Sequence, residues 1–174
     1  MPDTAPRNRI ETLWQGLIAG LLGYAVVAIL VGGIDVARGR SFFYTAALLG
    51  EWLFGGLSDA RQVTVWPGAV FAYNGLHLAT FLVFGIIAAW LASLSERGHA
   101  LWYAGLVLYI LVLAHLEAAV WVMTEGIRAA LPDYQVLIPG FVGATAMALY
   151  LLRVHPGLRR QMRHWEDDDE RVPT

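Results

Sequence analysis

Long apolar runs alternate with short polar stretches along this chain, and four of the runs are long enough to cross a bilayer. A membrane-spanning helix needs about 20 mostly apolar residues. The predicted spans cover residues 13–34, 70–94, 101–123 and 134–152. The runs are continuous rather than alternating, and backbone groups in lipid must be satisfied internally. The pattern therefore predicts an all-α, four-helix membrane bundle rather than a β-barrel.

The polar stretches predict how these spans connect. Residues 95–100 are short enough for a tight turn, so the second and third spans should form an antiparallel hairpin. Gly126 and Pro132 break the chain between the third and fourth spans. Inside the fourth span, Pro139 predicts an irregular first turn.

A shorter apolar and aromatic stretch, residues 41–57, lies in the long link between the first two spans. Ser41 can cap a helix there, and Gly55 with Gly56 can end it. The stretch is short for a span and is interrupted by Glu51. We therefore predict an amphipathic helix in the membrane interface, with a re-entrant segment as the alternative.

This interfacial segment should present large side chains to lipid or to a partner protein. Glu51 lies among them and would then need water or a partner. The side chains predicted to make these contacts are Phe42, Phe43, Tyr44, Trp52 and Phe54.

Composition agrees with a membrane protein. Apolar residue types make up 57% of the 174 residues and charged types 15%, with a mean hydropathy of +0.54. Soluble domains average about 45–50% and about 25% respectively. The net charge of −2 argues against a nucleic-acid partner, and the absence of cysteine excludes disulfides and thiolate metal sites.

The distribution of arginines predicts an orientation. If residues 1–12 are cytoplasmic, eight arginines face inward and four face outward, which favours cytoplasmic termini in a bacterial inner membrane. The inward set is Arg7, Arg9, Arg97, Arg153, Arg159, Arg160, Arg163 and Arg171, and the outward set is Arg38, Arg40, Arg61 and Arg128.

Residues 153–174 form a polar cytoplasmic tail in this topology. Arg159, Arg160 and Arg163 lie close enough to the inner leaflet to attract anionic headgroups. The acidic residues 166–170 follow and point away from the membrane. Such a charge run is a solvated end or a contact for a positively charged partner.

Small residues predict where the helices approach one another, because close packing rather than the hydrophobic effect drives helix association in lipid. They recur at helical spacing in the first, second and fourth spans. The positions are Gly16, Gly20, Gly23, Gly85, Gly140, Gly143 and Ala144.

Three ionisable side chains lie within the predicted spans: His77, His115 and Glu117. Ionisable groups at membrane depth are costly, so each suggests a function. At 1.5 Å per residue, His77 lies about 10 Å and His115 about 12 Å from the outer ends of their spans. Glu117 lies two positions from His115, so it faces a different neighbour.

Matched depths on one hairpin suit two axial ligands of a haem or a two-imidazole metal site, and a single histidine could hold a chlorophyll-type pigment. Asn74 could then orient the His77 ring. The alternatives are that each histidine hydrogen-bonds a neighbouring helix, or that it moves a proton or ion.

No catalytic motif is present, and four small helices cannot bury all of their aromatic faces. We therefore expect a non-catalytic accessory or structural subunit of a larger membrane complex of the respiratory or photosynthetic electron-transfer type. The first alternative is a small membrane cytochrome or metal-binding redox protein that uses His77 and His115. The second is a small-solute or proton transporter.

Overall fold

The computed structural model describes residues 9–96, 105–106, 109–110, 112, 121 and 123–159, and within these residues the chain is mainly helical without strands. This confirms the predicted all-α class. Three long helices are joined by short elements. In chain order they are α1 (Arg9–Ala37), α2 (Tyr44–Gly55), the 3₁₀ turn η1 (Ala60–Gln62), α3 (Pro67–Ser95), α5 (Glu125–Arg128) and α6 (Asp133–Val154).

Helices α1, α3 and α6 are each long and apolar enough to cross a membrane. They contain the first, second and fourth predicted spans. Most of the third, residues 101–123, lies outside the described residues. The structure therefore agrees with a membrane location through three candidate spans, and the four-span bundle stays a prediction.

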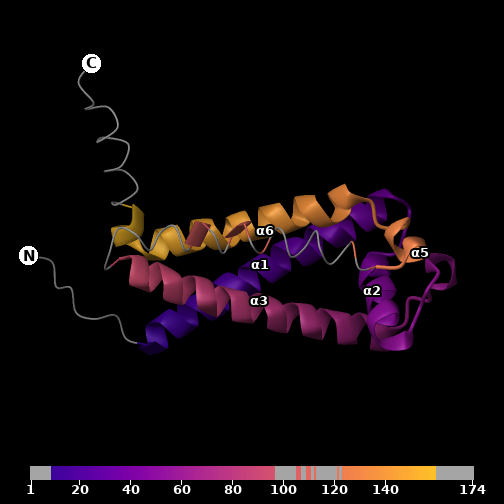
Figure 1. Ribbon diagram of the computed structural model, residues 1–174, viewed down its shortest axis with the longest axis horizontal. Helices are drawn as coiled ribbons and strands as arrows, with labels where there is room; N and C mark the ends of the chain where they lie inside the picture. Colours follow the sequence, from indigo (N-terminus) through magenta and orange to yellow (C-terminus); the bar gives the residue numbers. More distant parts are fainter. Residues whose placement is uncertain are drawn as a thin grey trace, which may run out of the picture.

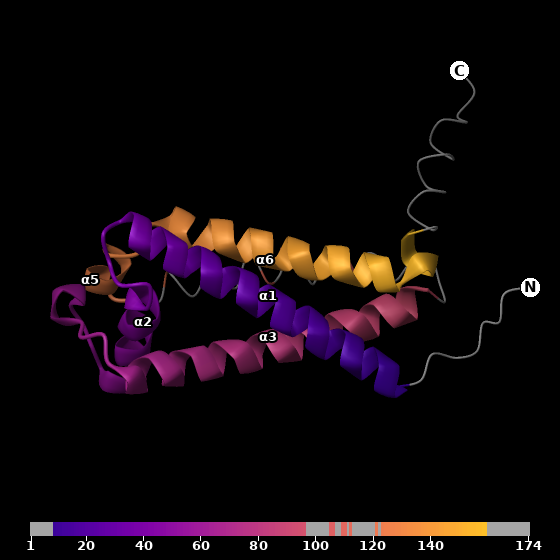
Figure 2. The same cartoon turned by 180° about the vertical axis from the view of Figure 1, so that it is seen from behind.

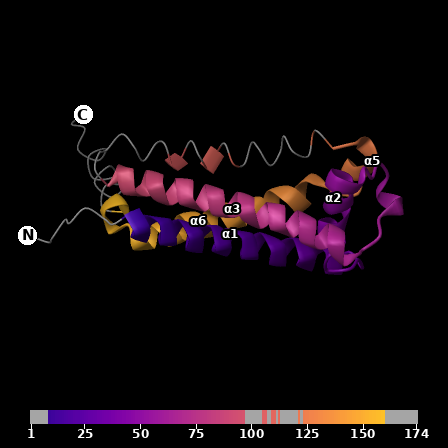
Figure 3. The same cartoon turned by 90° about the horizontal axis from the view of Figure 1, so that it is seen from below.

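Of the three long helices, α1 and α3 cross each other, and the short helix α2 lies between them at one end. Helix α1 runs antiparallel to α3 and α6 and crosses α3 in the first half of α1, while α6 lies alongside α1 (Figures 1 and 2). The short helices α2 and α5 gather at one end (Figure 3). At that end α1 and α3 have diverged, and α2 lies between them.

Glycines make the crossing of α1 and α3 possible. A Cβ atom added at Gly20 would lie 2.4 Å from the backbone oxygen of Phe81, and one at Gly85 would lie 2.3 Å from the backbone oxygen of Gly16. Neither contact is compatible with a side chain, so these positions allow the two backbones to touch. One at Gly16 would likewise lie 2.5 Å from the Cα of Ile86.

Glycines also lie between α6 and α1, but there they mainly face side chains rather than backbone atoms. A Cβ at Gly23 would lie 2.4 Å from the Sδ of Met147, and one at Gly143 would lie 2.6 Å from a methyl of Val27. Of the other two predicted packing positions on α6, Gly140 is buried and Ala144 is partly buried.

Helix α2 lies within the predicted segment 41–57, and some of its large side chains are buried while others are exposed. It ends at Gly56, whose φ of +69° glycine adopts without strain. Its Leu48 and Leu49 are buried against Ile127 and Leu131 of the α5 region. Whether this helix lies in a membrane interface stays a prediction.

The Glu51 carboxylate has a hydrogen-bonding partner within the chain, because it accepts bonds from the backbone N–H and the hydroxyl of Thr64 at 3.2 and 2.8 Å. These bonds lie at the surface, so a further contact of Glu51 with water or a partner protein stays a prediction. Pro139 lies inside a continuous α6 rather than in an irregular first turn. Its ring is fully buried, and membrane helices tolerate proline where neighbouring segments pack around it.

Candidate ligand-binding site

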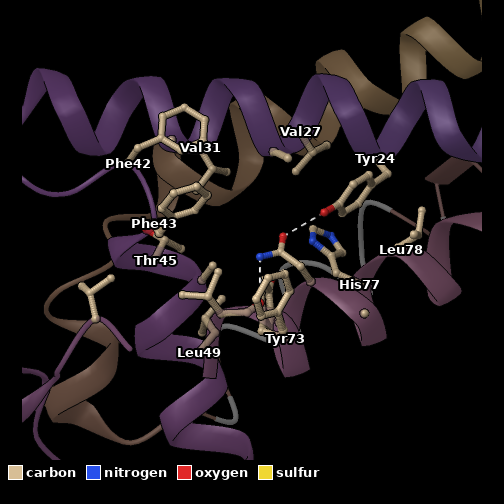
Figure 4. Close-up of a pocket in the computed structure, with 18 of the residues that line it drawn as sticks. Tyr24, Val27, Val31, Phe42, Phe43, Thr45, Leu49, Tyr73, His77 and Leu78 are labelled. Atoms are coloured by element: carbon tan, nitrogen blue, oxygen red, sulfur yellow. Dashed lines mark hydrogen bonds between the residues drawn. The ribbon is translucent and has the colours of Figure 1, made fainter. Parts of the chain in front are cut away.

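The divergence of α1 and α3 from their crossing leaves a partly open cavity of about 850 Å³. Figure 4 shows its walls, with α1 on one side, α3 on the other and α2 at the end. Helix α6 and the segment before α3 contribute the remaining side chains. The α1 and α3 residues that line it include Tyr24, Val27, Ala28, Val31, Val70, Tyr73, Asn74, His77 and Phe81.

The lining of this larger cavity is apolar and rich in rings. Phe42 and Phe43 enter it from the segment before α2 and stack edge to face at a centroid distance of 5.1 Å. They are two of the predicted lipid or partner contacts, and here they form part of a cavity wall. None of the described lining residues carries a charge. This surface therefore suits an apolar, uncharged molecule.

Polar groups converge at one place on the wall. The hydroxyl of Tyr24 donates a hydrogen bond to Oδ1 of Asn74 at 3.0 Å, and Nδ2 of Asn74 donates to the backbone oxygen of Val70 at 2.8 Å (Figure 4). The predicted role of Asn74 was to orient His77. Among the described residues, its amide instead links α3 to α1 through Tyr24.

The imidazole of His77 lies beside this pair and is surrounded by rings. Its centroid lies 5.0 Å from that of Phe81, 5.2 Å from Tyr73 and 5.9 Å from Tyr24. No described residue is hydrogen-bonded to either ring nitrogen. A neutral imidazole has one donor and one acceptor nitrogen, so His77 can offer both to a molecule in the cavity.

A second, smaller cavity of about 460 Å³ adjoins the first. It lies between α3 and α6 and is also lined by Gly105, Leu106, Tyr109 and Val112. The Tyr109 hydroxyl lies 3.3 Å from that of Thr145 on α6. Three residues, His77, Phe81 and Gly140, line both cavities, so the two spaces adjoin at these residues.

A buried polar cluster closes the α2 end of the larger cavity. The Asp35 carboxylate is fully buried and accepts hydrogen bonds from Nε2 of Gln135 at 2.7 Å and from the backbone N–H of Thr45 at 2.9 Å. The same Gln135 nitrogen lies 2.9 Å from the Thr45 hydroxyl. The cluster joins the end of α1 to the starts of α2 and α6.

Two arginines extend this cluster outward. Arg38 donates to Oε1 of Gln135 at 2.5 Å, and Arg40 donates to the backbone oxygen of Ala130 at 3.0 Å. The Arg40 guanidinium also lies 4.3 Å from the ring centre of Tyr44. Both guanidinium groups are therefore bound to other parts of the protein. They stabilise the cavity wall and are not directed into its interior.

Sequence reasoning missed this cluster. The signals were Asp35, which ends the uncharged first run, and Gln135, which is polar within the predicted fourth span. Nothing in the sequence pairs them, because they lie 100 positions apart.

The remaining predicted site residues are placed as follows. Trp52 is partly buried against the α2–α5 core, while Phe54 and Arg159 are exposed. The positions of His115, Glu117, Arg160, Arg163 and the acidic residues 166–170 lie outside the described residues. Within the described part of the chain, no group of three or more His, Asp or Glu side chains could hold a metal ion. A site shared by His77 and His115 stays a prediction.

No protein-family model, curated protein or solved structure matches this chain. Its function is therefore inferred from its residues and their geometry.

Proposed function

We propose that this protein is a non-catalytic membrane protein that binds an apolar, lipid-soluble molecule in the larger cavity. The observation that supports this is the cavity itself, which is large, lined mainly by rings and aliphatic side chains, and carries a few polar side chains. Binding sites for small molecules have volumes of about 300–1,000 Å³, apolar walls and a few placed polar groups. The cavity of about 850 Å³ with Tyr24, Asn74 and His77 on its wall fits that description.

The chemistry of the wall narrows the ligand further. Burying a charged group without a partner is costly, and the described lining offers no opposite charge. Ions, nucleotides and sugars are therefore poor candidates. A molecule that partitions into the bilayer would reach the site between α1 and α3 without crossing water.

Filling the cavity should remove the ligand. Ala28 lines the cavity from α1, and its replacement by tryptophan would occupy space that the ligand needs. An overlap of this kind costs about 1–3 kcal/mol, which corresponds to a roughly ten- to hundredfold loss of affinity. Mass spectrometry of organic extracts from protein purified in mild detergent should show a discrete apolar compound with the wild type and much less with Ala28→Trp.

Ala72→Trp is the matched control, because Ala72 is exposed on α3 and lines neither cavity. This variant should retain the compound. Extracts that contain only the bulk lipids of the membrane, in the same ratios for all three proteins, would contradict the proposal. A Soret absorption band in the same preparation would instead support the haem hypothesis.

A second candidate function is that of an accessory subunit of a larger electron-transfer complex in a bacterial inner membrane, with both termini cytoplasmic. It is favoured by apolar side chains that remain exposed at the α2 end. Phe54 and Trp66 are 62% and 52% exposed there. A partner protein that covers this end would remove them from water or from polar headgroups.

The subunit proposal predicts that the protein co-purifies with larger membrane proteins in mild detergent. Deleting residues 166–174 should weaken the association, and more strongly at low salt, where charge attraction is least screened. Size-exclusion chromatography with mass spectrometry of the eluted proteins would measure this. A lone monomer whose elution the deletion does not change would rule the subunit role out and leave the ligand-binding role unaffected.

A further inference from the structure

His77 lines both the larger and the smaller cavity, with both ring nitrogens lacking a described hydrogen-bond partner. Two other polar side chains of the larger cavity are paired within the protein. The Asn74 amide bonds Tyr24 and Val70, and the Gln135 amide bonds Asp35. The ligand can therefore form hydrogen bonds with His77 without breaking bonds within the protein.

We propose that His77 hydrogen-bonds an uncharged oxygen on an aromatic or quinone-type ring, and that the apolar tail of this molecule extends past Phe81 into the smaller cavity. This inference rests on the proposed binding function and adds the class of ligand and its direction.

The rings around His77 indicate a planar head group. Phe81, Tyr73 and Tyr24 place their ring centres within 6 Å of the imidazole, and Phe42 with Phe43 lies on the α2 side of the same cavity. Aromatic side chains pack favourably on another ring in offset or edge-to-face arrangements. A saturated lipid chain would gain no such preference.

The electrostatics of the wall indicate that the ring oxygen is neutral. No described lining residue is an arginine, and Arg38, which bonds the lining residue Gln135, also donates to the backbone oxygen of Ala130. A carboxylate or phosphate head would therefore be buried without a counter-charge. A carbonyl or hydroxyl oxygen needs only one donor or acceptor, which the imidazole supplies.

The smaller cavity fits the rest of such a molecule. It begins at the residues shared with the larger cavity and continues along α3 and α6 past Phe84, Ala88 and Ala144. These side chains are apolar, and they lead away from the polar groups at Tyr24 and Asn74. A chain attached to the ring can follow this direction because the polar side chains of the smaller cavity already have partners in the protein. Thr80 and Ser95 donate to backbone oxygens of their own helix, and the Tyr109 hydroxyl lies 3.3 Å from that of Thr145.

Three alkylbenzene probes of the same tail length test the head group: 4-nonylphenol, nonylbenzene and 4-nonylbenzoate. Titration calorimetry of the full-length protein in detergent, corrected with protein-free micelles, should rank the phenol tightest. One hydrogen bond changes affinity by roughly three- to tenfold. His77→Phe keeps a ring but removes both nitrogens. It should therefore lower the affinity for 4-nonylphenol by that factor and leave the affinity for nonylbenzene unchanged. His77→Gln should recover part of the loss.

The tail is tested by 4-ethylphenol beside 4-nonylphenol. Ala144→Phe fills part of the smaller cavity. It should therefore lower the affinity for 4-nonylphenol several-fold and leave the affinity for 4-ethylphenol unchanged. Ala72→Phe places the same side chain on an exposed position and should change neither.

The outcomes separate this inference from the function on which it rests. If none of the probes binds and Ala28→Trp changes nothing, the binding function itself fails. If nonylbenzene binds as tightly as the phenol and His77→Phe has no effect, the cavity binds ligands but the His77 contact is wrong. Tightest binding of 4-nonylbenzoate would overturn the uncharged head group.

Discussion

Replacing Gly20 with leucine should separate α1 from α3 and strongly destabilise the protein. Even a Cβ atom at this position would lie 2.4 Å from the backbone oxygen and 2.8 Å from the Cα of the residues it faces, Phe81 and Leu82. Backbone atoms within a helix cannot rotate away as a side chain can. Overpacking of a rigid contact costs about 3 kcal/mol or more, so thermal unfolding in detergent should show a large loss of stability for Gly20→Leu.

Gly33→Leu is the matched control on the same helix. A Cβ at Gly33 meets no atom within 4 Å, and leucine has a higher helix propensity than glycine by up to about 1 kcal/mol. This variant should be as stable as the wild type or slightly more stable. Equal stability of the two variants would show that the crossing of α1 and α3 does not depend on glycine. Loss of ligand binding should accompany the loss of stability, because the crossing defines one end of the larger cavity.

Replacing Asp35 with alanine should produce the second large effect. The substitution leaves one N–H of the Gln135 amide and the backbone N–H of Thr45 without their acceptor at nearly fully buried positions, while the amide keeps its bond to the Thr45 hydroxyl. Each buried donor left unsatisfied costs about 1–3 kcal/mol, so the free energy of unfolding should fall by roughly 2–5 kcal/mol. Denaturant titration in mixed micelles would measure this.

Asp59→Ala provides the comparison, because Asp59 is also hydrogen-bonded to a backbone N–H but lies at the surface beside a fully exposed Arg61 side chain. Removing the Asp59 carboxylate should lower the free energy of unfolding by about 1 kcal/mol or less. Combining Asp35→Ala with Gln135→Leu should lower the free energy of unfolding by less than the sum of the two single changes, because Gln135→Leu removes the amide that Asp35→Ala leaves without its acceptor. Additive losses would indicate that Asp35 acts independently of Gln135.

The C-terminal end of α2 was predictable from single residues, but its start was not, because the N-cap is Phe43 rather than Ser41. Gly55 and Gly56 end α2 as expected, and the helix lies within residues 41–57. The depth of burial along α2 was not predictable, because Leu48 and Leu49 resemble a lipid-facing pair in the sequence. They are buried because residues distant in the sequence pack against them, among them Tyr73 of α3, Ile127 of α5 and Leu131.

The candidate site shows the same division between local and long-range information. The sequence indicates His77 as a costly polar residue in an apolar run, together with nearby Asn74. It does not indicate that Tyr24 on another helix bonds Asn74, nor that Phe42 and Phe43 line the same space. The predicted pairing of His77 with His115 remains open, since His115 lies outside the described residues.

The sequence by itself determined the helical class and the candidate membrane spans, because continuous apolar runs have few structural solutions in lipid. It also marked the glycines at which helices can approach. Only the tertiary structure decided which backbones those glycines contact, and hence where α1 and α3 cross and diverge into a cavity. The same holds for the Asp35–Gln135 bond. Such contacts join residues far apart in the chain. Their energies depend on how deeply they are buried, which a local sequence pattern does not predict.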